Sequence, residues 1–302
     1  MPAHTAGSGT FGPVGYTLAG DGTRLAYGLS GPENGEPVVM IQGLGADRRG
    51  WARQRRAFAS RYRVLTPDNR GVGLSDQPAG PYDLGVMAED VLACMDDAGI
   101  ESAHIMGASM GGVISQIIGV LHPQRTRSLT LACTACQHHR WRRELLEGWA
   151  EDALLNGMRQ FAASKGKWLV GPRSLRRFWP VLGAFGGLAL NVQTRSFVAQ
   201  VRAILDADES LRFELPTIEV PTLVIVGSQD ILTPLADSEE LAGLIPGSRL
   251  AVIRGGAHGF MFENAGTFNE TILDFLSWAS ASGSADSVDS AESEGPELEI
   301  VA

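Results

Sequence analysis

Apolar and polar residues alternate along most of the chain in blocks that predict short strands separated by helices. Eight runs have the pattern of β-strands: 14–18, 24–28, 38–42, 64–66, 104–106, 128–132, 223–226 and 250–253. Helical spacing is found between them at 51–60, 84–97, 110–121, 236–244 and 267–278. Most of the strand runs are continuously apolar, which is typical of parallel strands buried on both faces. The alternation predicts an α/β fold, a mostly parallel sheet with helices on both faces.

The alternation of strands and helices is interrupted between Cys136 and about Leu215, where helical patterns continue without a convincing strand. We therefore expect a flexible N-terminal arm (1–13), an α/β core (14–136 and 216–280), an inserted helical cap (137–215) and a disordered acidic tail (281–302). The insert holds four tryptophans, which either form its own small core or line the underside of a cap over a substrate pocket. They are Trp141, Trp149, Trp168 and Trp179.

Composition and charge narrow the function classes. The chain has 302 residues, and no run approaches the roughly 18 apolar residues of a membrane-spanning helix. Its three cysteines are too few for a disulfide framework, which favours a reducing compartment, so we expect a cytoplasmic protein without membrane contact. The net charge is −9, and the tail carries six acidic residues without a basic one. Arginines are scattered and form no phosphate-tracking stripe, so nucleic acid is not an expected partner.

The most informative motif is Gly107-Ala108-Ser109-Met110-Gly111, placed directly after an apolar strand and directly before a helical pattern. It matches the G-x-S-x-G nucleophile elbow in its required strand–turn–helix context. The serine must sit in a tight turn with its oxygen exposed, and a Cβ on either flank would collide with the neighbouring strand or helix. Ser109 is the candidate nucleophile.

A serine hydroxyl needs a base, which is normally a histidine held by a carboxylate. Of the six histidines, His258 alone follows the last strand of the core in a loop of small residues, Gly255-Gly256-Ala257-His258-Gly259. The loop after the strand before the insert contains no carboxylate. The loop after the next strand contains one, Asp230, which is the candidate orienting acid.

Charge that develops on a tetrahedral oxyanion needs backbone N–H donors. We expect one from Met110, which follows the nucleophile, and one from Leu44 in the loop Gln42-Gly43-Leu44-Gly45. Substrate contacts are expected from Gly43 and Leu44 and from three cap tryptophans, Trp141, Trp149 and Trp179.

Together these motifs resemble the α/β-hydrolase fold superfamily, in the cap-bearing branch of esterases, enol-lactonases, aclacinomycin methylesterase-like enzymes and cofactor-free haloperoxidases. The likeness covers about residues 14–280 and includes the order Ser109, Asp230, His258 and a loop at 68–76 similar to the family's D-x-R-G-x-G-x-S. The resemblance implies an eight-stranded sheet and no cofactor. Gln42 stands where the family usually has His.

Positions at which this sequence differs from the family's motifs distinguish between the activities known in the family. Ser rather than Asp at 109 argues against dehalogenases and epoxide hydrolases, and Ala108 and Gly259 differ from carbon–carbon bond hydrolases. The expected function is hydrolysis of a carboxylic ester or lactone of a moderately large apolar small molecule through an acyl-enzyme. The alternatives are a carbon–carbon bond hydrolase, a haloperoxidase or perhydrolase, and a triad-bearing ligand receptor. The oligomeric state stays open.

Two further patterns are given structural interpretations. Cys133-x-x-Cys136 with His138 and His139 imitates a zinc cluster, but Cys133 ends a buried strand, so no metal is expected. The basic group of Arg140, Arg142 and Arg143 is interpreted as a solvated helix face.

Overall fold

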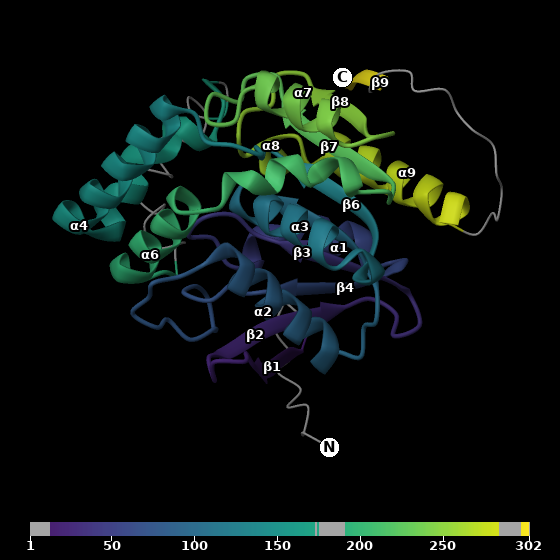
Figure 1. The fold of residues 1–302 in the computed structure, drawn as a ribbon, viewed down its shortest axis with the longest axis horizontal. Coiled ribbons are helices and arrows are strands. Elements are labelled where there is room, and N and C mark those ends of the chain that lie inside the picture. Colours follow the sequence, from purple (N-terminus) through teal and green to yellow (C-terminus); the bar gives the residue numbers. More distant parts are fainter. Residues whose placement is uncertain (1–12, 173, 175–190, 284–296, 302) are drawn as a thin grey trace.

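The computed structural model describes residues 13–172, 174, 191–283 and 297–301. Their strands form one sheet of nine, in the order β1-β2-β4-β3-β5-β6-β7-β8-β9. Pairs β1–β2 and β2–β4 are antiparallel, and every later pair is parallel (Figure 1). The strands are β1 (Val14–Leu18), β2 (Arg24–Ser30), β3 (Glu36–Ile41), β4 (Tyr62–Pro67), β5 (Ala103–Ala108), β6 (Thr126–Ala132), β7 (Thr222–Gly227), β8 (Arg249–Ile253) and β9 (Glu297–Val301).

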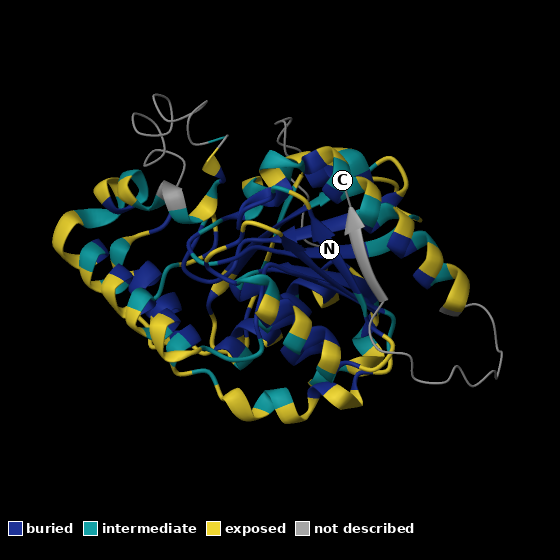
Figure 2. Ribbon diagram, turned by 90° about the horizontal axis from the view of Figure 1, so that it is seen from above, coloured by how far each residue is buried: buried dark blue, intermediate teal, exposed yellow. Residues whose placement is uncertain are grey.

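The continuous apolar runs are buried on both faces of the sheet, as expected for parallel strands. In β3, Val38 and Met40 join one core cluster and Val39 and Ile41 join the other. Figure 2 shows the buried residues concentrated along the sheet, with exposed positions on the outer helices. Successive side chains of a strand therefore anchor helices on opposite sides.

Helices cover both faces. One cluster packs the sheet against α1 (Ala52–Phe58), α8 (Phe260–Glu263) and α9 (Ala265–Gly283). The other packs it against α2 (Leu84–Asp97), α3 (Met110–Leu121) and α7 (Leu235–Leu244). The predicted mostly parallel α/β architecture is confirmed.

The region between β6 and β7 contributes two long helices, α4 (Arg140–Leu169) and α6 (Thr194–Leu205), which pack together. Figure 1 shows them beside one end of the sheet. Gly157 interrupts α4 with a left-handed φ of 75° and ψ of 161°, so the helix is kinked there. Residues of both halves, before and after Gly157, line the cavity described below.

The loop at 68–76, which resembles the family's motif, has an architectural role. Asp68 accepts a hydrogen bond from the backbone N–H of Arg48 at 2.8 Å. Arg70 binds both carboxylate oxygens of Asp90, at 2.5 and 2.7 Å. The Arg70–Asp90 ion pair connects the loop to α2, and Asp68 connects it to the 3-10 helix Arg48–Trp51 that follows β3.

The expectation of a wholly disordered tail is wrong for its described residues. The first three, 281–283, end α9, and Glu297–Val301 forms β9, which pairs with β8 so that Leu250 lies opposite Leu298. The physical reason is the alternating sequence ELEIV beside the open backbone groups of β8, which would otherwise be an edge strand. The sheet accordingly has one strand more than the eight expected.

Candidate active site

Ser109 lies in the turn between β5 and α3 with a left-handed φ of 54°. Its backbone N–H donates to Ala132 O at 2.9 Å, which fixes the turn against β6. A Cβ on Gly107 would approach Gly111 O to 2.1 Å, and one on Gly111 would approach Ile41 O to 2.3 Å. The flanking glycines are therefore required by close backbone approach, and the motif forms the strained elbow that its sequence predicted.

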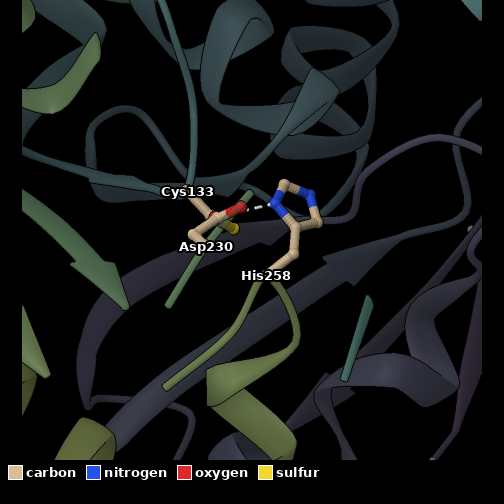
Figure 3. A group of neighbouring side chains, drawn as sticks. All are labelled: Cys133, Asp230 and His258. Carbon is tan, nitrogen blue, oxygen red and sulfur yellow. Dashed lines mark hydrogen bonds and ion pairs between the residues drawn. The ribbon is translucent and has the colours of Figure 1, made fainter. Parts of the chain in front are cut away.

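Asp230 and His258 meet because they follow neighbouring parallel strands, β7 and β8. His258 Nδ1 lies 2.9 Å from Asp230 Oδ2 (Figure 3). The other carboxylate oxygen, Oδ1, accepts from the backbone N–H groups of Leu232 at 2.9 Å and Thr233 at 3.0 Å. The Thr233 hydroxyl donates to Oδ2 at 2.9 Å. The carboxylate is thus held in one orientation toward the imidazole.

The surroundings of Asp230 favour its ionised form. Burial alone would raise its pKa, but the charge of His258, their hydrogen bond and the donors of Thr233 outweigh burial and lower the pKa below its usual value. Both side chains are buried, with 8% of His258 and none of Asp230 exposed. A buried carboxylate that stays charged can stabilise an imidazolium formed during a reaction.

The loop expected to supply an oxyanion donor lies against the nucleophile. A Cβ built on Gly43 would be 3.1 Å from Ser109 Cβ and 3.7 Å from its Oγ. On the other side, Gly112 and Val113 donate to Ser109 O in the first turn of α3. The N–H of Met110, the first residue of that helix, precedes these donors and has no intrahelical acceptor. The loop that contains Leu44 and the helix start that contains Met110 therefore both adjoin Ser109, and both residues line the cavity.

A cavity of about 500 Å³ connects these parts. Its lining is mostly apolar and comes from the loop 42–46, the elbow, both halves of α4, α6, and the loops of Asp230 and His258. Two basic residues of the lining, Arg142 and Lys165, are paired with Asp237 and Asp152. The cavity therefore offers a large apolar surface with little free charge. Predicted residues on its surface include Ser109, His258, Gly43, Leu44 and Met110.

The three cap tryptophans expected at the substrate have different positions. Trp149 lines the cavity and is 6% exposed, with its ring against those of Phe161 and Trp168. Trp141 is 42% exposed and lies outside the cavity lining, beneath the guanidinium of Arg142. It precedes that inward-facing arginine by one position, which turns it outward on the helix. Trp179 lies outside the described residues.

Two residues near the acid were missed or misread from the sequence. Thr233 donates to Asp230 and lies 3.3 Å from His258 Nδ1. Its signal was its place three residues after the acid in the same turn. Arg142 was interpreted as solvated, whereas it is 2% exposed. Arginine carries no sequence signal for burial unless its partner, here Asp237, is known.

Cys133 lies beside the Asp230–His258 pair (Figure 3). Their potential ligand atoms are within 4.8 Å of one another, and no other such group occurs in the described part of the chain. Burial and the charge of Asp230 raise the pKa of the Cys133 thiol well above its ordinary value. In the metal-free protein the thiol is therefore protonated. All three cysteines are free, and Cys136, His138 and His139 do not join this group.

Comparisons with known proteins agree with this geometry. A family described as alpha/beta hydrolase fold matches residues 36–265. The chain is 30% identical over 262 residues to a protein of Azorhizobium caulinodans named "Putative carbamate hydrolase RutD", covering 86% of this chain and 97% of the relative. The structure of an enol-lactonase from Burkholderia xenovorans LB400 superposes with a TM-score of 0.81 at 32% identity, covering 87% of this chain and 100% of the other.

A thermophilic esterase from Thermogutta terrifontis is also similar, with a TM-score of 0.80 at 25% identity over 88% of this chain and 98% of the esterase. Within the described ranges, no helix is both long and apolar enough to cross a membrane.

Proposed function

Because the chain belongs to the α/β-hydrolase fold family and its relatives support a hydrolase, we propose that it cleaves carboxylic esters or lactones through a serine acyl-enzyme. The observation that carries this proposal is the buried Asp230–His258 hydrogen bond beside the cavity that Ser109 also lines. An oriented base and a half-buried serine that lines the cavity from a strained turn are the parts that acyl transfer needs.

The proposed mechanism gives each of these groups one role. Ser109 Oγ attacks the carbonyl carbon as His258 Nε2 takes its proton, and the backbone N–H groups of Leu44 and Met110 stabilise the oxyanion. Collapse of the intermediate breaks the bond to the alkoxy oxygen, which receives the proton from His258, so that an ester releases its alcohol and a lactone opens to a hydroxyacyl-enzyme. Water then attacks the acyl-enzyme with His258 again as base, releasing the acid and restoring Ser109. Asp230 orients the imidazole and stabilises its cationic form.

The cavity supports a moderately large, largely uncharged substrate. Its volume of about 500 Å³ falls in the usual range for small-molecule sites, and burial of apolar surface supplies most of the binding free energy in such a site. The paired state of Arg142 and Lys165 leaves no dedicated partner for a substrate carboxylate among the described lining residues. Aryl esters and larger lactones fit this description.

A carbamate is a second candidate substrate, because one relative carries the name of a carbamate hydrolase. Carbamates have the same carbonyl electrophile, and the same residues would act on them. Carbon–carbon bond hydrolysis, perhydrolysis and a receptor role are the remaining alternatives.

A substrate panel tests the proposal. Aryl and alkyl esters, lactones of increasing size, thioesters and carbamates are incubated with the wild type and with Ser109→Ala. We expect multiple turnovers on esters or lactones by the wild type alone. Turnover confined to carbamates would move the assignment to that class. A single turnover on every substrate would favour a receptor, and activity retained by Ser109→Ala would reject the mechanism.

A further inference from the structure

Arg142, in the first turn of α4, is a buried cation at the start of the insert. Its Nε donates to Leu232 O at 2.9 Å, and Nη1 donates to Gln137 O at 3.0 Å. Its Nη2 forms an ion pair with Asp237 in α7. All three guanidinium nitrogens therefore donate to protein acceptors. The guanidinium links the start of the insert to the loop of Leu232 and to α7.

The carbonyl that Arg142 binds belongs to the same peptide group as the N–H that holds the catalytic acid. Leu232 C=O and Thr233 N–H form one planar unit. The oxygen accepts from Arg142 Nε, and the N–H donates to Asp230 Oδ1 at 3.0 Å. Hydrogen bonds joined through one peptide polarise each other, so a cation at the oxygen makes the N–H a better donor.

This chain of contacts continues to the base. Asp230 accepts at Oδ1 from the bridging peptide and at Oδ2 from His258 Nδ1, 2.9 Å away. The position of Arg142 thus fixes the plane of the peptide, the peptide fixes the carboxylate, and the carboxylate fixes the imidazole. Arginine suits this place because its planar fork holds three separate acceptors at once and keeps its charge when buried.

We propose that Arg142 is a positioning residue that couples the start of the insert to the catalytic acid through the Leu232–Thr233 peptide. The proposal rests on the serine hydrolase function above. It assigns to an insert residue a role in the chemical step, carried through Asp230 and without contact between Arg142 and the reacting atoms.

Two substitutions at this position and one beside it test the proposal. Arg142→Lys keeps a positive charge but lacks the planar fork, and Arg142→Met removes the charge. Arg143→Met is the matched control, because Arg143 also donates to a backbone carbonyl, Leu205 O at 2.7 Å, but on the α6 side. We expect kcat to fall about tenfold in both Arg142 variants, with KM within twofold of the wild type. Arg143→Met should retain both constants.

The kcat and KM values separate positioning from substrate binding. If KM rises and kcat is unchanged, Arg142 contacts substrate and the proposal is overturned. Circular dichroism and thermal melting check folding. Should Arg142→Met fail to fold, Arg142→Lys decides the question.

A double-mutant cycle shows whether Arg142 acts through Asp230. The rate at which a fluorophosphonate labels Ser109 is measured for the wild type, Arg142→Lys, Asp230→Asn and the double variant. The lysine variant should label about tenfold more slowly than the wild type, and should change the rate less than twofold when Asp230 is already Asn. A further tenfold loss in the Asp230→Asn background would overturn the proposal. An unlabelled wild type would reject the hydrolase function itself, whereas equal labelling of wild type and Arg142→Lys would reject only the positioning role.

Discussion

His258 Nδ1 and Asp230 Oδ2 lie 2.9 Å apart across the ends of two neighbouring strands. Since an ionised carboxylate only accepts hydrogen bonds, this contact assigns the imidazole proton to Nδ1. Nε2 is then free to accept the proton of Ser109. The pair therefore selects the tautomer in which His258 acts as a base.

Loss of the carboxylate should remove that selection. Asp230→Asn is expected to lower kcat about 10²- to 10⁴-fold while the fold persists by circular dichroism. Asp274→Asn, the same chemical change at an exposed position of α9, should leave kcat unaltered. Equal activity of Asp230→Asn and wild type would mean that another group orients His258.

The Thr233 hydroxyl should contribute less than the carboxylate of Asp230 to the orientation of His258. It donates to Asp230 Oδ2 at 2.9 Å, and one such bond contributes about 1 kcal/mol. We expect Thr233→Val to lower kcat about 3- to 10-fold, whereas Thr233→Ser, which keeps the hydroxyl, should stay near the wild-type value. Steady-state kinetics of the two variants decides the matter. If serine and valine have equal effects, the hydroxyl is not the cause.

Stability should fall as the solution becomes acidic, partly because of His138. Burial and the charge of Arg142 lower the pKa of His138 to about 4, so the folded protein keeps it neutral over a range in which an unfolded chain, with a pKa of about 6.5, protonates it. Below about pH 6.5 the unfolded state thus binds more protons, and the free energy of unfolding decreases until about pH 4.

Thermal melts between pH 7.5 and 5 measure this dependence. His138→Gln should lose fewer degrees over that interval than the wild type. An identical pH dependence in His138→Gln and wild type would exclude His138 as a source.

Removal of β9 should destabilise the sheet edge without changing the chemistry. Deletion of residues 284–302 uncovers the backbone of β8, and a loss on the scale of 1 kcal/mol would lower the melting temperature by about 2–4 °C. In the full-length chain, Ile300→Pro should have a similar effect, because proline cannot donate to the ladder. Differential scanning calorimetry tests both changes, and kcat at low temperature should be retained. Unchanged melting of the truncated protein would show that β9 contributes no stability.

The elements of the core were predictable because their signals are local. The ranges 84–97 and 110–121 predicted from helical spacing coincide with α2 and α3. The elbow was predictable from its glycines, and the Asp230–His258 meeting from the rule that loops after adjacent parallel strands share an edge.

The remaining features depend on contacts between distant segments. Arg142 lies 90 residues from Leu232, and nothing in the local sequence distinguishes it from the exposed Arg140. The pairing of β9 with β8 was likewise not predictable. The acidic, serine-rich tail has a composition typical of disorder, although its last residues alternate as a strand does. The outward position of Trp141 depends on how the helix is rotated about its axis, and that rotation is known only once its neighbour Arg142 is seen to face inward.

The most direct test of the account is the mass of the peptide that contains Ser109. The wild type is mixed with a slowly hydrolysed aryl ester, quenched in acid, digested and mapped by mass spectrometry, with Ser109→Ala treated in parallel. The account predicts one acyl group per chain on Ser109, lost on longer incubation as the acyl-enzyme hydrolyses, and no acylation of Ser109→Ala. Acyl groups on another residue, or substrate turnover by Ser109→Ala, would contradict it.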